Sequence, residues 1–238
     1  MMELALDTSS NTISIAVSQQ GKVVNELTWQ TRRNHTIELT SGITYLLGQA
    51  GITAGSLEAI FVARGPGSFN GLRVGISTAK GLAFALKIPL LGISTLEADA
   101  YPFACTGLPL YPLHAAGRGE IATASYQQIG EEWHSLEAEH LTTLEALCQQ
   151  IGGKSLVCGD FPPEIEEELR LMSGNQIIIP EAAARLRRAG FLGSLGWENL
   201  SSGKQDNPVT LQPLYLRPPH ITKPKKSFSP IATKNINE

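Results

Sequence analysis

Hydrophobic positions in the first hundred residues follow a strand period in some segments and a helix period in others. Apolar runs and alternation over residues 4–6, 13–17 and 23–29 predict three strands in a meander. Residues 35–49 repeat apolar side chains at helical spacing, which predicts a helix and the burial of Leu39, Ile43, Leu46, Leu47 and Ala50. A strand at 60–63, a long helix at 70–86 and a strand at 90–93 complete a mixed α/β lobe with helices against its sheet.

The pattern changes near Tyr101, where proline and glycine become frequent, and we place a lobe boundary there. Strands are predicted at 110–113, 121–129 and 155–158, and helices at 143–151, 163–172 and 180–192. From Pro218 onward the sequence is rich in Pro, Lys and Ser without periodicity, which is typical of a flexible tail. The predicted organisation is a first lobe over 1–100, a second lobe over 101–217 whose last helix can pack back on the first, and a basic tail over 218–238.

A glycine-rich loop joins the strand that ends near Ala63 to the helix that begins near Asn70. Its sequence over residues 64–76 is RGPGSFNGLRVGI. Such a loop can gather backbone N–H groups and the positive end of a helix at one point, which favours an anion. The alternative is that the glycines only make a sharp turn, because the loop lacks the Gly-Lys-Ser/Thr ending of a P-loop and the spacing of a dinucleotide site.

The helix after this loop is apolar on nearly every side, since Arg73 and Lys80 carry its only charges between residues 72 and 86. Small residues let neighbouring helices approach closely. Here they form two stripes at four-residue spacing, Gly71, Gly75, Ala79 and Ala83 in one and Ser77, Gly81 and Ala85 in the other. One stripe can face the sheet of its own lobe, and the other then needs a second helix from this chain or from another one.

Composition and charge narrow the class of protein only a little. With 42% hydrophobic and 17% charged residues over 238 positions, the chain can form one large domain or two lobes. Its net charge of −3 gives no general reason to bind nucleic acid, although residues 217–238 carry five Lys or Arg and one Glu. The three cysteines have no metal-type spacing, and we find neither a signal sequence nor a membrane-length apolar run, so we expect a cytoplasmic protein with no membrane partner.

Other polar groups do not form a recognisable catalytic site. Ser68 lacks the Gly-x-Ser-x-Gly context of a hydrolase nucleophile. A lone histidine at a helix start, such as His35, is typical of a solvated or capping residue. Arg185, Arg187 and Arg188 are expected at the surface, with an RNA contact as the alternative.

Five pieces of the sequence, in order, resemble the TsaB family, also called YeaZ. They are Leu6-Asp7-Thr8-Ser9, the loop from Gly65 to Gly75, Gly81-Leu82-Ala83, Ala116 to Glu120, and Pro213 to Arg217. The central loop is specific, and the outer pieces are weak alone but correct in order. Asn70 stands where the family more often has Thr, and both residues can cap a helix.

The resemblance implies the two-lobed fold of the actin-like and Hsp70-like ATPases and a role in tRNA modification. Family members are the small, non-catalytic partners of TsaD, the enzyme that adds threonylcarbamoyl to adenosine 37 of tRNA. We therefore expect a non-catalytic scaffold that pairs with a TsaD homologue, together with a TsaE-type ATPase, forms a homodimer when isolated and serves tRNA indirectly. The helices at 35–50 and 70–86 are the expected interface, with partner contacts from Ile43, Leu47, Arg73, Gly75, Ile76, Ala79, Leu82 and Ala83.

The resemblance also bears on cofactors. In this superfamily the acidic turn after the first strand approaches nucleotide phosphates, which makes an anion or nucleotide loop of Asp7, Thr8, Ser9, Gly65, Gly67 and Ser68. The turn lacks the glycine usual in active members. TsaD relatives carry a His-x-x-x-His metal motif where this chain has Thr95 and Asp99, and a hydroxyl and one carboxylate do not replace two imidazoles. We expect no metal and no stably bound cofactor on this chain, with ATP or ADP and the metal on partner subunits.

The rival class is an enzyme of the same superfamily, either a glycoprotease-like metallopeptidase or an ATP-dependent small-molecule kinase. Thr95 and Asp99 argue against the first, and the incomplete phosphate loops argue against the second. Metal analysis and an ATP titration on the purified chain distinguish both from a scaffold.

Overall fold

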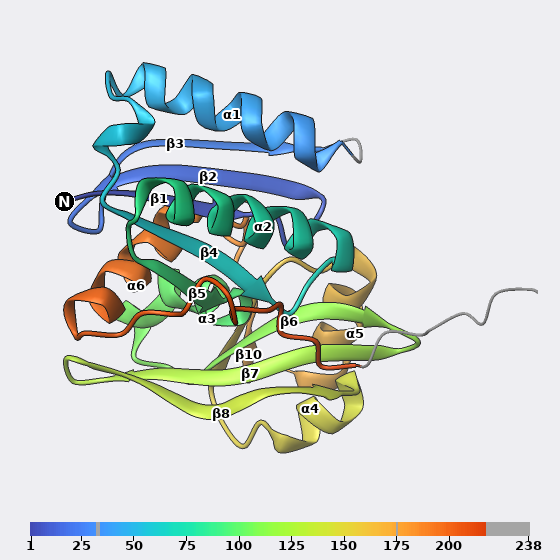
Figure 1. Ribbon diagram of the computed structural model, residues 1–238. Helices are drawn as coiled ribbons and strands as arrows, with labels where there is room; N and C mark the ends of the chain where they lie inside the picture. The colour runs from blue at the N-terminus through green and yellow to red at the C-terminus, as the bar shows by residue number, and fades with distance from the viewer. Residues whose placement is uncertain (32–33, 175, 218–238) are drawn as a thin grey trace, which may run out of the picture.

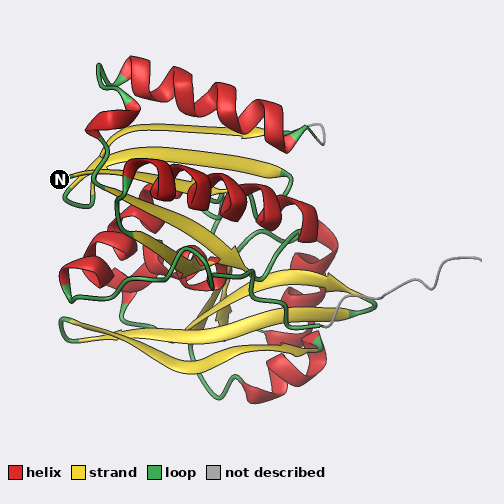
Figure 2. Cartoon of the chain, in the orientation of Figure 1, coloured by secondary structure: helices red, strands yellow, loops and turns green. Residues whose placement is uncertain are grey.

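Two lobes make up the protein, each built on a five-stranded sheet with helices against it (Figure 1). The computed structural model describes residues 1–31, 34–174 and 176–217. The predicted basic tail over 218–238 lies outside the described residues. The sheets and their covering helices alternate in layers through both lobes (Figure 2).

The first sheet has the strand order β3-β2-β1-β4-β5. The predicted meander is confirmed, because the first three strands are antiparallel neighbours. The next two strands run parallel to the first, as crossover connections require. The strands are β1 (Met2–Asp7), β2 (Thr12–Gln19), β3 (Lys22–Gln30), β4 (Ala59–Gly65) and β5 (Leu90–Ser94).

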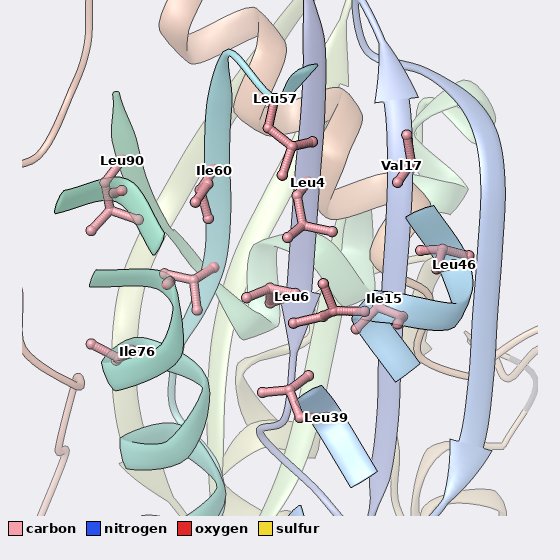
Figure 3. Packing of buried hydrophobic residues seen from close by; sticks show 14 of the residues in the cluster. Leu4, Leu6, Ile15, Val17, Leu39, Leu46, Leu57, Ile60, Ile76 and Leu90 are labelled. Atoms are coloured by element: carbon pink, nitrogen blue, oxygen red, sulfur yellow. The ribbon is translucent and has the colours of Figure 1, made fainter. Parts of the chain in front are cut away.

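Three helical segments lie between the strands of this sheet along the chain. The predicted helices at 35–49 and 70–86 are confirmed as α1 (His35–Gln49) and α2 (Phe69–Leu86), and a short 3-10 turn, η1 (Ala54–Ser56), precedes β4. Side chains of α1 and α2 share one cluster with the large side chains of β1 and β2 (Figure 3). Ala50, just after α1, is half-buried and packs at the edge of this cluster.

The second sheet repeats the topology of the first. Its order is β10-β9-β6-β7-β8, again an antiparallel meander followed by two strands parallel to its first strand. The predicted strands are confirmed as β6, β7 and β9, whereas the polar edge strand β8 and the two-residue β10 were not predicted. The strands are β6 (Leu110–Gly117), β7 (Glu120–Ile129), β8 (Glu132–Thr142), β9 (Ser155–Cys158) and β10 (Ile177–Ile178).

The helices between residues 95 and 173 either cover the second sheet or connect the two lobes. The predicted helices at 143–151 and 163–172 are confirmed as α4 (Leu144–Gln150) and α5 (Pro163–Ser173), which pack with the apolar side chains of β6, β7 and β9. The short helix α3 (Thr95–Ala100) and the 3-10 segment η2 (Tyr101–Thr106) connect the lobes. No helix within the described residues is long and apolar enough to cross a bilayer.

The prediction of a helix at 180–192 is wrong. Residues 181–188 form turns and loop, and the helix is α6 (Ala189–Ser201). The alanine-rich segment 181–185 favours a helix by local propensity, but Arg185 and Arg187 are drawn into buried polar contacts that a continuous helix does not supply. Tertiary contacts therefore decide where this helix begins.

α6 packs on the face of the first sheet opposite α1 and α2. Successive residues of a strand point to opposite faces, so Leu4 and Leu6 of β1 pack with α1 and α2 while Ala5 packs with α6. The small side chain of Ala5 and the glycines of α6 allow a close approach: a Cβ at Gly196 would lie 2.3 Å from Cγ of Phe61. The last helix within the described residues is thus part of the first lobe.

Candidate site between the two lobes

A cavity of about 500 Å³ opens between the lobes. The first lobe lines it with the turn after β1, over residues 9–11, and with the glycine loop, over residues 66–69. The second lobe contributes His114 and its neighbours on β6, with Ala122, Leu141 and Asp160. The segment over 208–217, here called the strap, begins in a turn and runs from the first lobe to the second (Figure 1). It lines the remaining side of the cavity with residues 214–217.

The glycine loop and the acidic turn after β1 pack directly on each other. A Cβ at Gly67 would lie 2.3 Å from the carbonyl oxygen of Ser9, and one at Gly71 would lie 2.0 Å from that of Thr8. Both distances are far below any real contact, so only glycine fits at these two positions. The glycines therefore serve a close approach of two backbones, which the sharp-turn interpretation did not include.

Hydrogen bonds within the chain occupy several of the groups that an anion could use. The backbone N–H of Ser68 donates to Ser9 at 2.6 Å, and that of Gly65 donates to Oγ1 of Thr95 at 3.1 Å. Asp7 accepts from the backbone and hydroxyl of Ser9, and Thr8 donates to the carbonyl of Gly71 at 2.7 Å. Asp7, Thr8 and Ser9 are all buried. The predicted anion loop is assembled in space, but these donors already have partners within the chain.

The cap of α2 differs from the sequence-based expectation. Ser68, not Asn70, is the N-cap, and its hydroxyl accepts from the backbone N–H of Gly71 at 3.3 Å. Asn70 is exposed in the first turn. The family preference for Thr at that position is therefore not explained by capping here.

A buried arginine links the lobes beside the cavity. Arg187 is 3% exposed and donates from Nε and Nη2 to the two carboxylate oxygens of Asp99, and from Nη1 to the hydroxyl of Ser9 at 2.7 Å. Burial raises the pKa of Asp99 to about 6, against the opposing charge of Arg187, and the nearby carboxylates of Asp7 and Asp160 add to the rise. Asp99 remains ionised at neutral pH, and the ion pair closes this part of the lobe junction.

The surface prediction is wrong for two of the three arginines. Arg185 is also buried, bonds Glu166 and stacks 4.2 Å from the ring centre of Phe161. Arg188 is exposed as expected and pairs with Glu26. A short run of arginines is typical of a solvated surface. Burial of Arg185 and Arg187 depends on acidic partners that are distant in sequence, such as Asp99, and the local pattern does not show them.

The two positions that match a metal motif have structural partners instead. Thr95 accepts the Gly65 bond already described, and Asp99 is paired with Arg187. Within the described residues no three His, Cys, Asp or Glu side chains gather in a way that could hold a metal ion.

Two histidines lie near the acidic turn. His35 is half-buried at the start of α1, and its Nε2 is 3.2 Å from the carbonyl oxygen of Ser10. His114 lines the cavity, and burial lowers its pKa to about 4, with the charge of Arg187 acting in the same direction. His114 is therefore neutral at physiological pH.

Aromatic side chains stand at the rim of the cavity. Phe69 of α2 stacks on Tyr215 of the strap, with ring centres 5.1 Å apart, and the guanidinium of Arg73 lies 5.1 Å from the ring centre of Phe69. The strap is held on the first lobe by the bond from the Leu214 N–H to the Arg64 carbonyl at 2.7 Å, and on the second by the ion pair of Arg217 with Glu120. These contacts place the family-like segment Pro213–Arg217 directly against the glycine loop.

The predicted partner residues divide between core and surface. Most of them are buried against the chain's own sheet, so these side chains are unavailable to a partner; they are Ile43, Leu47, Gly75, Ile76, Ala79 and Ala83. Arg73 is exposed and Leu82 half-buried. The inward stripe of α2 is the one that contains Gly75, and the outward stripe is Ser77, Gly81 and Ala85. A partner role for these helices stays a prediction, and it moves to their outward faces.

These outward faces carry exposed apolar side chains. Phe84 of α2 is 83% exposed and Ile37 of α1 is 73% exposed, and Tyr45 of α1 is exposed as well. The two helices lie side by side on this face of the first lobe (Figure 1). A Cβ at Gly81 meets no atom within 4 Å, so this point of α2 is open.

Comparison with known proteins gives one family model. The model of TsaD, tRNA N6-adenosine threonylcarbamoyltransferase, matches residues 9–190. A Bacillus subtilis protein named tRNA threonylcarbamoyladenosine biosynthesis protein TsaB is 35% identical over 53% of this chain, and this match spans only 56% of the relative's length. The Escherichia coli protein of the same name is 28% identical over 91% of this chain and 95% of its own.

Solved structures agree in fold. A Pseudomonas aeruginosa protein described as similar to peptidase YEAZ has a TM-score of 0.77 and 26% identity over 91% of this chain and 99% of its own. The activator of 2-hydroxyisocaproyl-CoA dehydratase from Clostridium difficile has a TM-score of 0.52 and 12% identity over 87% of this chain and 100% of its own, a likeness of fold alone. The two-lobed actin-like fold expected from the sequence is confirmed.

Proposed function

Because this chain belongs to the TsaD family and, within it, to the TsaB or YeaZ branch, we propose that it acts in threonylcarbamoyladenosine biosynthesis on tRNA as a scaffold that pairs with a TsaD homologue. The TsaD homologue transfers the threonylcarbamoyl group to adenosine 37 of tRNA. This chain contributes a surface and no catalytic residue, and tRNA is served indirectly through the complex.

The outward face of α1 and α2 carries this proposal. Apolar side chains as exposed as Phe84 and Ile37 are unusual together on one face, and such patches mark surfaces that bind another protein. Small residues beside Phe84 on the outward stripe of α2 permit the close approach of a partner helix. The same face supports a homodimer of the isolated chain, which a TsaD homologue displaces.

The proposal that this chain is not catalytic rests on two residues at the junction of the lobes. Thr95 and Asp99 occupy the metal positions of the TsaD motif and are engaged with Gly65 and Arg187. The metal, the ATP or ADP and a TsaE-type ATPase then belong to partner subunits, and the complex works in the cytoplasm. The enzyme alternatives need a metal or ATP bound to this chain itself, so metal analysis and an ATP titration test them directly.

The deciding experiment places a large charged side chain at the open point of α2. Gly81→Arg extends into solvent and leaves the fold intact, because no atom lies within 4 Å of the new Cβ. We expect loss of co-purification with the tagged TsaD homologue and a lower threonylcarbamoyladenosine content in tRNA of cells that depend on the variant.

Glu167→Arg, at an exposed position of α5, is the matched control, and it keeps both pairing and modification. If the folded Gly81→Arg variant pairs with the TsaD homologue as well as the wild type does, the proposed surface is contradicted. Normal pairing together with lost modification would contradict the pure scaffold role, because it would show that α2 acts after assembly.

A further inference from the structure

We propose that the strap is part of the partner surface, and that it binds a segment of the TsaD homologue that carries apolar and acidic side chains. The inference rests on the proposed function, because it adds residues to the same interface and names the chemistry that they select. These residues follow one flank of α2 and the adjoining strap, and are here called the lateral strip: Phe69, Arg73, Lys80 and Phe84 of α2, with Val209 and Tyr215 of the strap.

α2 has α1 on one flank and the strap on the other (Figure 1). The strap touches α2 at two places along the helix. Nζ of Lys80 donates to the carbonyl oxygen of Val209 at 3.3 Å, and the ring of Phe69 stacks on Tyr215. Phe84 lies one turn after Lys80 on the same side of the helix, so it projects toward the strap flank. The exposed face of α2 therefore continues onto the strap.

Val209 is an apolar side chain that a fixed turn holds in solvent. It is 82% exposed, whereas Leu211, two residues later, is 7% exposed in the core cluster. The side-chain oxygen of Asn207 accepts from the N–H of Val209 at 2.8 Å, and its carbonyl oxygen accepts from the N–H of Leu211 at 3.0 Å. Just before this turn, the N–H of Asp206 donates to the carbonyl oxygen of Leu90 at 2.9 Å. Because the backbone here is already ordered, burial of Val209 by a partner costs little further conformational entropy.

The charge of the lateral strip has one sign. Residues 69–86 of α2 and 208–217 of the strap contain no Asp or Glu. Their cations are Arg73, Lys80 and Arg217. Opposite charges across an interface select the right partner and speed its docking, and like charges select against the wrong one. The strip therefore fits a segment that places carboxylates beside apolar side chains.

A second copy of this chain is a poorer occupant of the strip. In a two-fold dimer the same patch of both copies meets itself. Arg73 and Lys80 would then face the same cations of the other copy, with no acidic residue of α2 or the strap to offset them. The strip thus favours the TsaD homologue, and a homodimer that uses the outward faces of α1 and α2 leaves the strap outside its contact.

The test applies one change to two exposed apolar residues. Val209→Asp puts a carboxylate in the strip, and Leu171→Asp, at an 86% exposed position of α5, is the matched control. Calorimetry with the purified TsaD homologue should show pairing at least tenfold weaker for Val209→Asp and unchanged for Leu171→Asp. Urea unfolding verifies that both variants are folded. Wild-type pairing by Val209→Asp would overturn the proposal.

Salt dependence tests the charge of the occupant. Pairing of the wild type should weaken as NaCl rises from about 0.05 to 0.5 M, because salt screens the cations of the strip from the partner's carboxylates. Arg73→Glu should weaken pairing at low salt and make this dependence shallower. An unchanged affinity and an unchanged salt dependence in Arg73→Glu would contradict an acidic occupant.

Comparison with Gly81→Arg separates this inference from the proposed function. If Gly81→Arg loses pairing and Val209→Asp keeps it, the strap is outside the interface and the scaffold function stands. If the wild type does not pair, or if Gly81→Arg pairs normally as well, both are overturned. Sedimentation of the isolated chain tests the other occupant: Val209→Asp should leave the homodimer unchanged, and loss of the homodimer with normal pairing would assign the strap to a second copy instead.

Discussion

Arg187 and Asp99 form a bidentate ion pair, with Nε and Nη2 of the guanidinium 3.1 and 2.7 Å from the two carboxylate oxygens. The pair joins the segment before α6 to α3, and both side chains are almost wholly buried. A charge in such a place is tolerated only with its partner present, because desolvation of an unpaired ion costs several kcal/mol. The pair therefore stabilises the junction of the lobes only while both partners are present.

Removal of one partner of this pair should be costly. Arg187→Met keeps the apolar length of the side chain and leaves Asp99 buried without its cation, so we expect a loss of about 3–5 kcal/mol in the free energy of unfolding. Urea denaturation measures it. Arg188→Met is the control and should cost much less, because Arg188 is about half exposed and its partner Glu26 keeps a bond from the Gly190 N–H.

The double variant Arg187→Met with Asp99→Leu should regain a large part of that loss, because no buried charge remains. A double variant as unstable as the sum of the two single changes would show that packing, and not the uncompensated charge, is what the arginine provides.

The two faces of α2 should respond oppositely to an added methyl group. Gly75→Ala places its Cβ 2.3 Å from Oγ1 of Thr8, a hydroxyl that is fixed by its bond to Gly71, so we expect a loss of about 1–3 kcal/mol. Gly81→Ala meets no atom within 4 Å and should raise stability by up to about 1 kcal/mol through helix propensity. Thermal or urea unfolding checks both, and equal effects at the two sites would contradict the orientation of α2.

His114 should make stability fall in acid. Burial lowers its folded pKa to about 4, below the value of about 6.5 in an unfolded chain. As the pH falls from about 6.5 to 4, the unfolded chain binds a proton that the folded chain does not, so His114 costs up to roughly 3 kcal/mol of stability. Comparison of the wild type with His114→Gln by urea unfolding between pH 7 and 4.5 isolates this contribution.

Asp99 acts in the opposite direction over part of that range. Its folded pKa, raised to about 6, means that it favours the folded state below about pH 4 and that this contribution is lost as the pH rises through 6. The pH curve of the wild type alone therefore mixes two opposed slopes. A difference between wild type and His114→Gln that stays constant with pH would contradict the burial of a neutral histidine.

The basic tail, which lies outside the described residues, gives a separate prediction. Deletion from Pro218 onward should leave folding, pairing and tRNA modification unchanged. If Lys223, Lys225, Lys226 and Lys234 contacted tRNA, each phosphate contact would add about 0.7–0.9 to the log–log slope of affinity against salt. A truncated chain with normal pairing, severalfold less modification and a shallower salt dependence would show that the tail acts on RNA.

Local sequence patterns were sufficient to predict a helix or strand where the buried side chains repeat with the period of that element. The alternation in β1 to β3, the stripe of α1 and the long apolar α2 all appear in the order that the sequence predicted. The specific glycine loop also led to the family that the comparisons found. These features are readable because each element buries one face regardless of what lies far away in the chain.

Long-range contacts account for the errors. Helical propensity over 181–185 was real, but Arg185 and Arg187 bond to groups that are distant in sequence, and the helix begins only at Ala189. The same holds for the partner contacts: both stripes of α2 are made of small residues, and the sequence did not say which one faces the sheet. Gly75 and Ala79, which were expected at the partner surface, face the core of their own lobe, and the outward stripe holds Ser77, Gly81 and Ala85 instead.

The sequence by itself determined the strand and helix order of the first lobe, the family and the absence of two imidazoles at Thr95 and Asp99. Only the tertiary structure decided that the glycines fit two backbones together, that Arg187 fills the lobe junction and that the strap brings Tyr215 to the cavity. The physical reason is that periodicity reports the burial of one element against its surroundings, whereas a buried ion pair or a backbone contact depends on which distant residue arrives at the same place.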